Sequence, residues 1–513
     1  MSSPERTIVV GGGIAGLLAA RRHALAGRRV TLLETEATTG GAIAADRVAG
    51  IDINIGAEAW SVGNGAVESL VAELGMADRV VSPVTGRGSR LVSVAGVHTA
   101  PPGGMFGIPA RPLSRPTREV LGTTGALRAW VERFLPAGFA LREGVTIGEY
   151  VRRRMGRRVV ERLVAPLVGG VHSADPYSLE LASTLPRLPD AVRETGSLAA
   201  AVRSLRPETA ASGRRSAGAA VRALTPTMAD LPRALEQQLR ELGAEVRTGT
   251  TALRIDRGPG STWQVTAAAP TDGDRSDVGQ AGGDQAGPAA VQLRAEHLVL
   301  ACPPDVTASL LEQTVPELAR AIPSAPAVPV RLVALVLDAP ALDSSPSGTG
   351  ALVAPGTPGV RAKALTHATA KWDHVRRAAG GLHVVRLSYG RPGEDLPEDD
   401  SHGADGTEGA IIELALTDAT AILRTPLDRS HLRAARVITW QRAMRRPGPG
   451  HREALDAITA LLTEEPRLEL VGSWRAGTGI DAIVRADART TTTPAPTPTT
   501  TVPSIHHVQE DRP

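Results

Sequence analysis

A cluster of glycines near the beginning of the chain has the spacing that binds a pyrophosphate. The segment satisfies the GxGxxG pattern, follows a short β-branched run at 7–10, and opens a stretch of helical composition that ends at Gly27. In such a turn the first glycine permits the tight bend, the second lets the backbone approach the pyrophosphate, and the third lets the helix pack closely on the strand. The helix N-terminus adds N–H donors and a positive dipole. The residues predicted to form this site are Gly11, Gly12, Gly13, Ile14, Ala15 and Gly16.

An acidic residue stands where a dinucleotide site requires one. Glu34 follows a second apolar run, 29–33, and lies 18 residues beyond Gly16, close to the roughly 20-residue spacing of the dinucleotide fingerprint. Its carboxylate would accept hydrogen bonds from ribose hydroxyls and would repel a 2′-phosphate, which argues against NADP. Together these segments predict a βαβ unit that holds a dinucleotide.

A second glycine pair, at 40–41, and an alternating apolar run at 50–55 follow this unit. The pair alone would also suit an ordinary turn. With the run it resembles the amine-oxidase-like flavoprotein superfamily, which usually has an arginine where this chain has Thr38, so one expected cofactor contact is missing. The resemblance implies that the residues along FAD here are Gly41, Ala42, Gly56, Ala57 and Glu58.

Three later segments are expected to return to the same sheet. They are 243–247, 297–301 and 468–474, and the last is followed by glycines where a strand meets a helix. The resemblance implies that the residues contacting FAD in this half are Val246, Gly477, Thr478, Gly479, Ile480 and Asp481. Because the single cysteine, Cys302, is not near the C-terminal loop, no thioether link is expected, and FAD is predicted to bind non-covalently.

The middle of the chain carries a narrower resemblance. The segments 159–172, 362–372 and 386–391 are similar to the FAD-dependent porphyrinogen oxidases of haem biosynthesis, in the actinobacterial form assigned to coproporphyrinogen III. The resemblance implies an oxidation of coproporphyrinogen III to coproporphyrin III with O2 as acceptor, release of hydrogen peroxide, and transfer of the product to the next haem-pathway enzyme. Protoporphyrinogen IX remains open as the alternative substrate.

A substrate with four propionates should meet cationic walls around an apolar cleft. The candidate residues are Arg111, Arg115, Lys363 and Lys371. The last two are the only lysines in a chain where arginine supplies every other cation, so a compact ammonium could be required there. The alternative is that all four are solvated surface residues, as we expect for the arginines at 152–154 and 157–158.

No residue is identified as catalytic, because the chain shows no nucleophile triad and no evident acid–base pair. Hydride transfer to a flavin needs little of either, since the cofactor carries the chemistry. An amine oxidase, a carotenoid-type desaturase and a flavin-binding protein without activity stay open as alternatives. The aromatic content of only 2% counts against the aromatic substrate box of amine oxidases.

Composition limits the partners and the compartment. The net charge of +3 and the lack of a basic run interleaved with aromatics argue against nucleic acid. One cysteine excludes an intrachain disulfide and any cysteine-rich metal spacing, so no metal site is predicted. No run reaches the roughly 18 apolar residues of a membrane span, and no signal sequence is evident. A cytoplasmic location is expected.

The predicted fold class is α/β, with a Rossmann-like FAD-binding domain, an inserted α+β substrate-binding domain and a helical subdomain. The FAD-binding domain is expected to be discontinuous, over 1–90, 216–305 and 440–489. The helical and substrate subdomain would span 91–215 and the substrate-binding domain 306–439. Residues 490–513, rich in Thr and Pro, are predicted to be a disordered tail.

Overall fold

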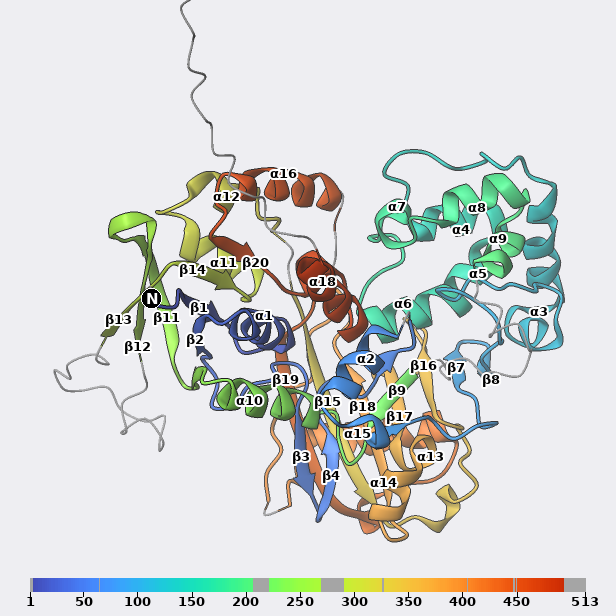
Figure 1. Ribbon diagram of the computed structural model, residues 1–513. Helices are drawn as coiled ribbons and strands as arrows, with labels where there is room; N and C mark the ends of the chain where they lie inside the picture. The colour runs from blue at the N-terminus through green and yellow to red at the C-terminus, as the bar shows by residue number, and fades with distance from the viewer. Residues whose placement is uncertain are drawn as a thin grey trace, which may run out of the picture.

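The computed structural model describes residues 3–63, 65–205, 221–268, 290–324, 327–403, 405–445, 448 and 450–492. Figure 1 shows a lobe built on a parallel sheet at the left, a helical lobe at the right and a mixed-sheet lobe below both. This arrangement confirms the predicted α/β class. Most of the predicted tail lies outside the described residues.

The parallel sheet has five strands. In spatial order they are β10 (Glu245–Arg247), β2 (Arg29–Leu33), β1 (Arg6–Val10), β14 (His297–Leu300) and β20 (Leu468–Leu470). All neighbours pair in parallel, so both faces must be covered by other elements. The three segments predicted to return to the sheet therefore do so.

Helices and a second sheet cover the parallel sheet. One face packs with α1 (Ile14–Leu25), α10 (Asp230–Glu241), α18 (Ile480–Thr492) and, beyond them, α2 (Ala66–Glu73). The other face packs with the antiparallel strands β11 (Thr251–Arg257), β12 (Trp263–Ala268) and β13 (Ala290–Ala295) and the helices α11 (Pro304–Leu311), α12 (Pro316–Ala321) and α16 (His451–Thr463). Shorter strands complete this lobe: β3 (Ala45–Val48), β4 (Ile51–Asn54), β5 (Trp60–Ser61), β6 (Val80–Val81) and β9 (Val221–Leu224).

The mixed sheet has seven strands. Their order is β19 (Leu432–Arg445), β15 (Ala327–Leu337), β18 (His383–Tyr389), β17 (Ala364–His367), β16 (Gly350–Val353), β7 (Arg90–Ser93) and β8 (Gly96–Thr99). Alternate residues point to opposite faces. One face packs on α15 (Ala410–Leu423), while the other turns toward the parallel-sheet lobe, beside α13 (Ala368–Lys371) and α14 (Asp373–Ala378).

The helical lobe is formed by α3 (Arg115–Trp130), α4 (Ile147–Met155), α5 (Arg157–Val159), a π-helical turn (Val160–Val164), α6 (Ala165–His172), α7 (Leu181–Thr184), α8 (Leu188–Thr195) and α9 (Leu198–Ser204). One arginine of the predicted solvated face is buried instead. The Arg154 and Glu132 side chains are 0% and 1% exposed and form an ion pair with an N–O distance of 3.2 Å. Because Glu132 also accepts the N–H groups of Leu198 and Ala199, the pair ties α4 to the start of α9.

Two of the predicted boundaries do not coincide with the strands and helices of the structure. Strands β7 and β8, which fall almost entirely in the predicted helical range 91–215, extend the mixed sheet instead. Helix α18 continues to Thr492, so the first three residues of the predicted tail are helical. The domain boundaries themselves stay predictions. In the part of the chain that the structure describes, no helix combines the length and apolar character required to cross a bilayer.

Candidate active site

The glycine loop at the end of β1 has two glycines that are required by packing and one that faces open space. Gly11 has φ +104°, and a Cβ at Gly16 would lie 1.9 Å from the Gly11 carbonyl oxygen. At Gly13 a Cβ would meet no atom within 4 Å, although this residue is the N-cap of α1. The loop therefore leaves space for a group to approach its backbone just where a pyrophosphate is expected.

Glu34 is held beside this loop by backbone donors. One carboxylate oxygen accepts the Gly12 N–H at 2.6 Å and the other accepts the Glu36 N–H at 2.8 Å. The Glu34 backbone bonds to Arg247 at the end of β10, which brings the adjacent Val246 to this edge of the sheet. Each carboxylate oxygen keeps a further acceptor position, as two ribose hydroxyls would need.

The second glycine pair lies against the first loop. The Gly40 N–H donates to the Gly12 carbonyl at 2.9 Å, and a Cβ at Gly41 would approach the Gly13 Cα to 3.4 Å. The Ala57 N–H donates to the Ala42 carbonyl at 2.8 Å, which connects this segment to the one that contains Gly56 and Glu58. The predicted N-terminal cofactor residues are therefore neighbours in space, while Thr38 is exposed.

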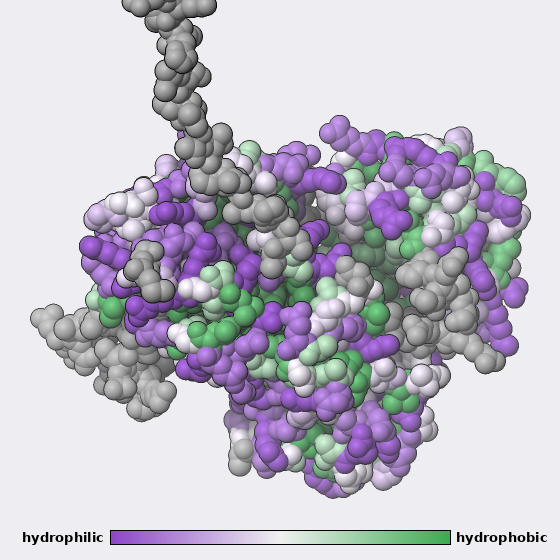
Figure 2. All heavy atoms as spheres, viewed as in Figure 1, coloured by the Kyte–Doolittle hydropathy of each residue, from purple (hydrophilic) through white to green (hydrophobic). Residues whose placement is uncertain are grey.

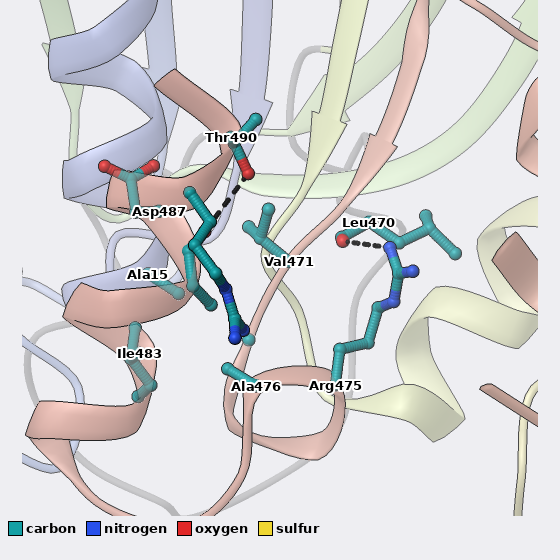
Figure 3. A pocket seen from close by; sticks show the side chains of 11 residues that line it. Ala15, Leu470, Val471, Arg475, Ala476, Ile483, Asp487 and Thr490 are labelled. Carbon is teal, nitrogen blue, oxygen red and sulfur yellow. Dashed lines mark hydrogen bonds between the residues drawn. The ribbon is translucent and has the colours of Figure 1, made fainter. Parts of the chain in front are cut away.

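A cavity of about 220 Å³ lies at the carboxyl end of β20, between the start of α1 and one side of α18. Ala15 of the glycine loop and Ile483 of α18 line it together, and Figure 3 shows Arg475 reaching back to the Leu470 carbonyl, at 2.8 Å. Ligands of open α/β sheets bind outside the carboxyl ends of the strands. Of the predicted cofactor residues, Ala15 lines this cavity, while Ala476 and Ile483 line it on either side of the predicted segment 477–481.

The C-terminal glycines give a sharp connection between α17 (Ser473–Ala476) and α18. Gly477 and Gly479 have φ of +104° and +107°, values that side-chain-bearing residues rarely adopt. Thr478 lies between them, and Ile480, the first residue of α18, is in the hydrophobic core. The Asp481 carboxylate pairs with Arg485 through one oxygen, while its Oδ1 is buried without a hydrogen-bond partner among the described residues.

Glu58 and Lys371, predicted as a cofactor contact and a substrate contact, bond to each other. The Lys371 Nζ lies 2.7 Å from one Glu58 oxygen, and the Trp372 Nε1 donates to the other at 3.0 Å. Burial alone would raise the pKa of Glu58, but the charges of Lys371 and Arg386 and the two hydrogen bonds lower it below its usual value. Glu58 is therefore ionised, and it joins the loop at 56–58 to α13 of the mixed-sheet lobe.

Lys363 is buried at the junction of the mixed sheet and the helical lobe. Its side chain is among the largest that are fully buried, and its Nζ donates to the Ser173 Oγ at 2.5 Å and to the Gly390 carbonyl at 2.8 Å. Burial, with a smaller contribution from the Arg391 charge, lowers the pKa of Lys363 to about 7. The ammonium has no carboxylate partner within ion-pair distance in the described part of the chain.

The structure does not bring the four candidate substrate cations together. Arg111 is exposed, and Arg115 is 86% exposed and paired with Glu119 on the same helix. Lys363 and Lys371 lie on different elements and already contact protein groups. A role in substrate binding for any of the four stays a prediction.

Sequence reasoning missed Arg386, although it lies within a segment that carried the family resemblance. Arg386 is on β18, and its guanidinium donates to the Gly56 carbonyl at 3.1 Å. The sequence pattern that could have indicated Arg386 is a single arginine in an apolar strand, Val384-Val385-Arg386-Leu387. Which face of the strand it occupied depended on pairing that the local sequence does not specify.

Comparison with known proteins places this geometry in a family. The model of the family described as flavin containing amine oxidoreductase matches residues 14–485. A curated coproporphyrinogen III oxidase from Mycobacterium leprae is 28% identical over 489 residues, which cover 94% of this chain and 96% of that protein. The crystal structure of a candidate protoporphyrinogen oxidase from Exiguobacterium sp. 255-15 shares the fold, with a TM-score of 0.75, 23% identity and coverage of 96% and 98%.

The same fold is found in an enzyme named for a different activity. Cyclohexylamine oxidase from Brevibacterium oxydans has a TM-score of 0.61 and 16% identity, and the match covers 95% of this chain and 98% of that one. This likeness concerns the fold only. Because the family model matches 14–485, which is most of the chain, the protein belongs to the flavin containing amine oxidoreductase family.

Proposed function

We propose that this protein is an oxygen-dependent coproporphyrinogen III oxidase that uses non-covalently bound FAD and releases hydrogen peroxide. The observation that carries the proposal is the end-to-end similarity to the coproporphyrinogen III oxidase of Mycobacterium leprae, which leaves neither chain with a large unmatched part. An apolar macrocycle with carboxylates needs a large, mainly apolar site with a few cations. Figure 2 shows hydrophobic surface in the hollow between the left and right lobes.

The residues at the carboxyl end of the parallel sheet suit FAD. The space at Gly13 and the N–H groups at the start of α1 would hold the pyrophosphate, and the Glu34 carboxylate would hold a ribose. The segment with Gly477 and Gly479 would hold the flavin ring through the start of α18. When bound, FAD supplies a hydride acceptor that passes electrons on to O2.

The protein groups then bind and orient the substrate. Six hydrogens leave coproporphyrinogen III in three two-electron oxidations, and three O2 become three H2O2. Glu58 is ionised and bonded to Lys371 and Trp372, so we assign it the task of fixing the loop at 56–58 rather than moving a proton. We retain Arg111, Arg115, Lys363 and Lys371 as candidate propionate contacts, and we place the reaction in the cytoplasm, with the product passing to the next haem-pathway enzyme.

The test is direct turnover by the purified holoenzyme. Chemically reduced coproporphyrinogen III should become fluorescent coproporphyrin III in air well above the autoxidation rate, with about three H2O2 per porphyrin as the stoichiometry requires. Protoporphyrinogen IX and cyclohexylamine serve as comparison substrates under the same conditions. A faster reaction with protoporphyrinogen IX, or oxidation of the amine alone, would replace the proposed activity by one of the alternatives.

A further inference from the structure

The face of the mixed sheet that turns toward the parallel-sheet lobe changes from buried to partly open along β18. Val384 belongs to the core shared with the parallel-sheet lobe, whereas Val385 and Leu387 point to the opposite face, against α15. By the two-residue alternation, Arg386 and Ser388 share the face of Val384. Both are only partly buried, so each keeps some exposed surface where the two lobes meet.

Arg386 is a cation with unused donors on this face. A guanidinium has five N–H donors, and within the described ranges Arg386 donates one hydrogen bond, to the Gly56 carbonyl. The nearest acidic group named by its electrostatics is Glu58, whose two oxygens are already bonded to Lys371 and Trp372. The cluster of Glu58, Lys371 and Arg386 therefore carries one positive charge in excess.

The neighbours of Arg386 on the sheet are small or hydroxylated. Thr366 of β17 and Ala334 of β15 lie directly across from it. Ser388, two residues along, lies across from Ala364 and Leu332. Thr366 and Ser388 are only partly buried, and their hydroxyls can add hydrogen bonds to a carboxylate held by Arg386.

We infer that Arg386 binds a carboxylate of the substrate and orients the macrocycle over the loop that contains Gly56. The inference rests on the proposed function, because it assigns the cation to a propionate of coproporphyrinogen III. It differs from the four sequence candidates in one respect. Arg386 lies beside the predicted FAD segment with donors to spare, whereas Lys371 is used by Glu58 and Arg115 is exposed at the start of α3. A planar fork also matches a carboxylate through two parallel bonds.

Binding of the product separates carboxylate recognition from turnover. The holoenzyme is titrated with coproporphyrin III and with its tetramethyl ester in the same detergent buffer, and quenching of porphyrin fluorescence gives Kd. Wild type should bind the acid more tightly than the ester. In Arg386→Met the Kd for the acid should rise about tenfold or more, while that for the ester stays within about twofold. Arg386→Lys should fall between the two.

Arg331→Met is the matched control. Arg331 lies on the neighbouring strand β15 but points to the other face, where it bonds to Thr439 and Pro397, so its loss should leave both porphyrin affinities unchanged. FAD content is read from the flavin absorbance of each variant.

Three results would overturn the inference. Equal acid binding by wild type and R386M would do so, and coproporphyrinogen turnover could then still support the proposed function. Loss of FAD from R386M, with acid and ester weakened alike, would instead give Arg386 a role in holding the Gly56 loop. A wild type that does not distinguish acid from ester would exclude carboxylate recognition, and turnover would then decide the proposed function separately.

Discussion

Two glycines of the loop at 11–16, Gly13 and Gly16, should respond in opposite ways to the same added methyl group. Gly13 has φ −68° and ψ 174°, which alanine adopts freely, and its Cβ would meet nothing. Gly13→Ala should therefore leave the flavin-free protein as stable as wild type or about 0.4–1 kcal/mol more stable. In Gly16→Ala the new Cβ would lie 1.9 Å from the Gly11 carbonyl oxygen and 3.0 Å from the Ala301 Cβ. Because backbone must move, we expect a loss of about 3 kcal/mol or more.

With FAD present, Gly13→Ala should be less stable to unfolding than the wild type. At a free concentration of about 100 times Kd, FAD should stabilise the wild type against unfolding by about 2.7 kcal/mol. Gly13→Ala should lose most of that gain, because its methyl group occupies the space that a pyrophosphate requires. Urea unfolding of flavin-stripped protein, with and without FAD, together with a fluorescence titration of FAD, measures both effects. Unchanged FAD affinity in Gly13→Ala would refute the assignment of this loop to the cofactor.

Three further perturbations test buried charges. Glu58→Gln leaves the Lys371 ammonium without its partner and should cost about 3–5 kcal/mol of unfolding free energy in urea, partly recovered in the double variant with Lys371→Met. Glu132→Gln should cost a similar amount, because Arg154 stays buried and unpaired. Lys363 has a folded pKa of about 7, below the unfolded value, so unfolding binds a proton and stability should rise between about pH 7 and 10.5, a rise that Lys363→Met abolishes. Because the chain has two lysines, NMR of ¹³Cε-labelled lysine should resolve this titration; a Lys363 signal that titrates near its ordinary value would contradict the prediction.

The sequence specified the parts of the site that depend on local signals. The strand, glycine turn and helix at 6–25 and the acidic residue that follows are all within one short segment, where periodicity and spacing are informative. The ion pair between Glu58 and Lys371 joins residues 313 positions apart, and no local pattern encodes such a contact. Arg154 was expected in solvent because its neighbours are charged, yet packing of α4 against Glu132 buried it. The face of the sheet on which Arg386 lies could not be predicted, because it depends on the register of β18 with its neighbouring strands.

The rarity of lysine in this chain correctly indicated two positions that use an ammonium, but it did not indicate which groups the two side chains contact. In a chain that otherwise uses arginine, both lysines are largely buried, and each places a compact ammonium close to hydrogen-bond acceptors. Lys363 reaches Ser173 and the Gly390 carbonyl, and Lys371 reaches Glu58. A planar guanidinium is broader and presents its donors in a fixed fork, so it is not equivalent to an ammonium at these positions. The ammonium groups thus connect the mixed-sheet lobe to the helical lobe, through Ser173, and to the loop that contains Glu58.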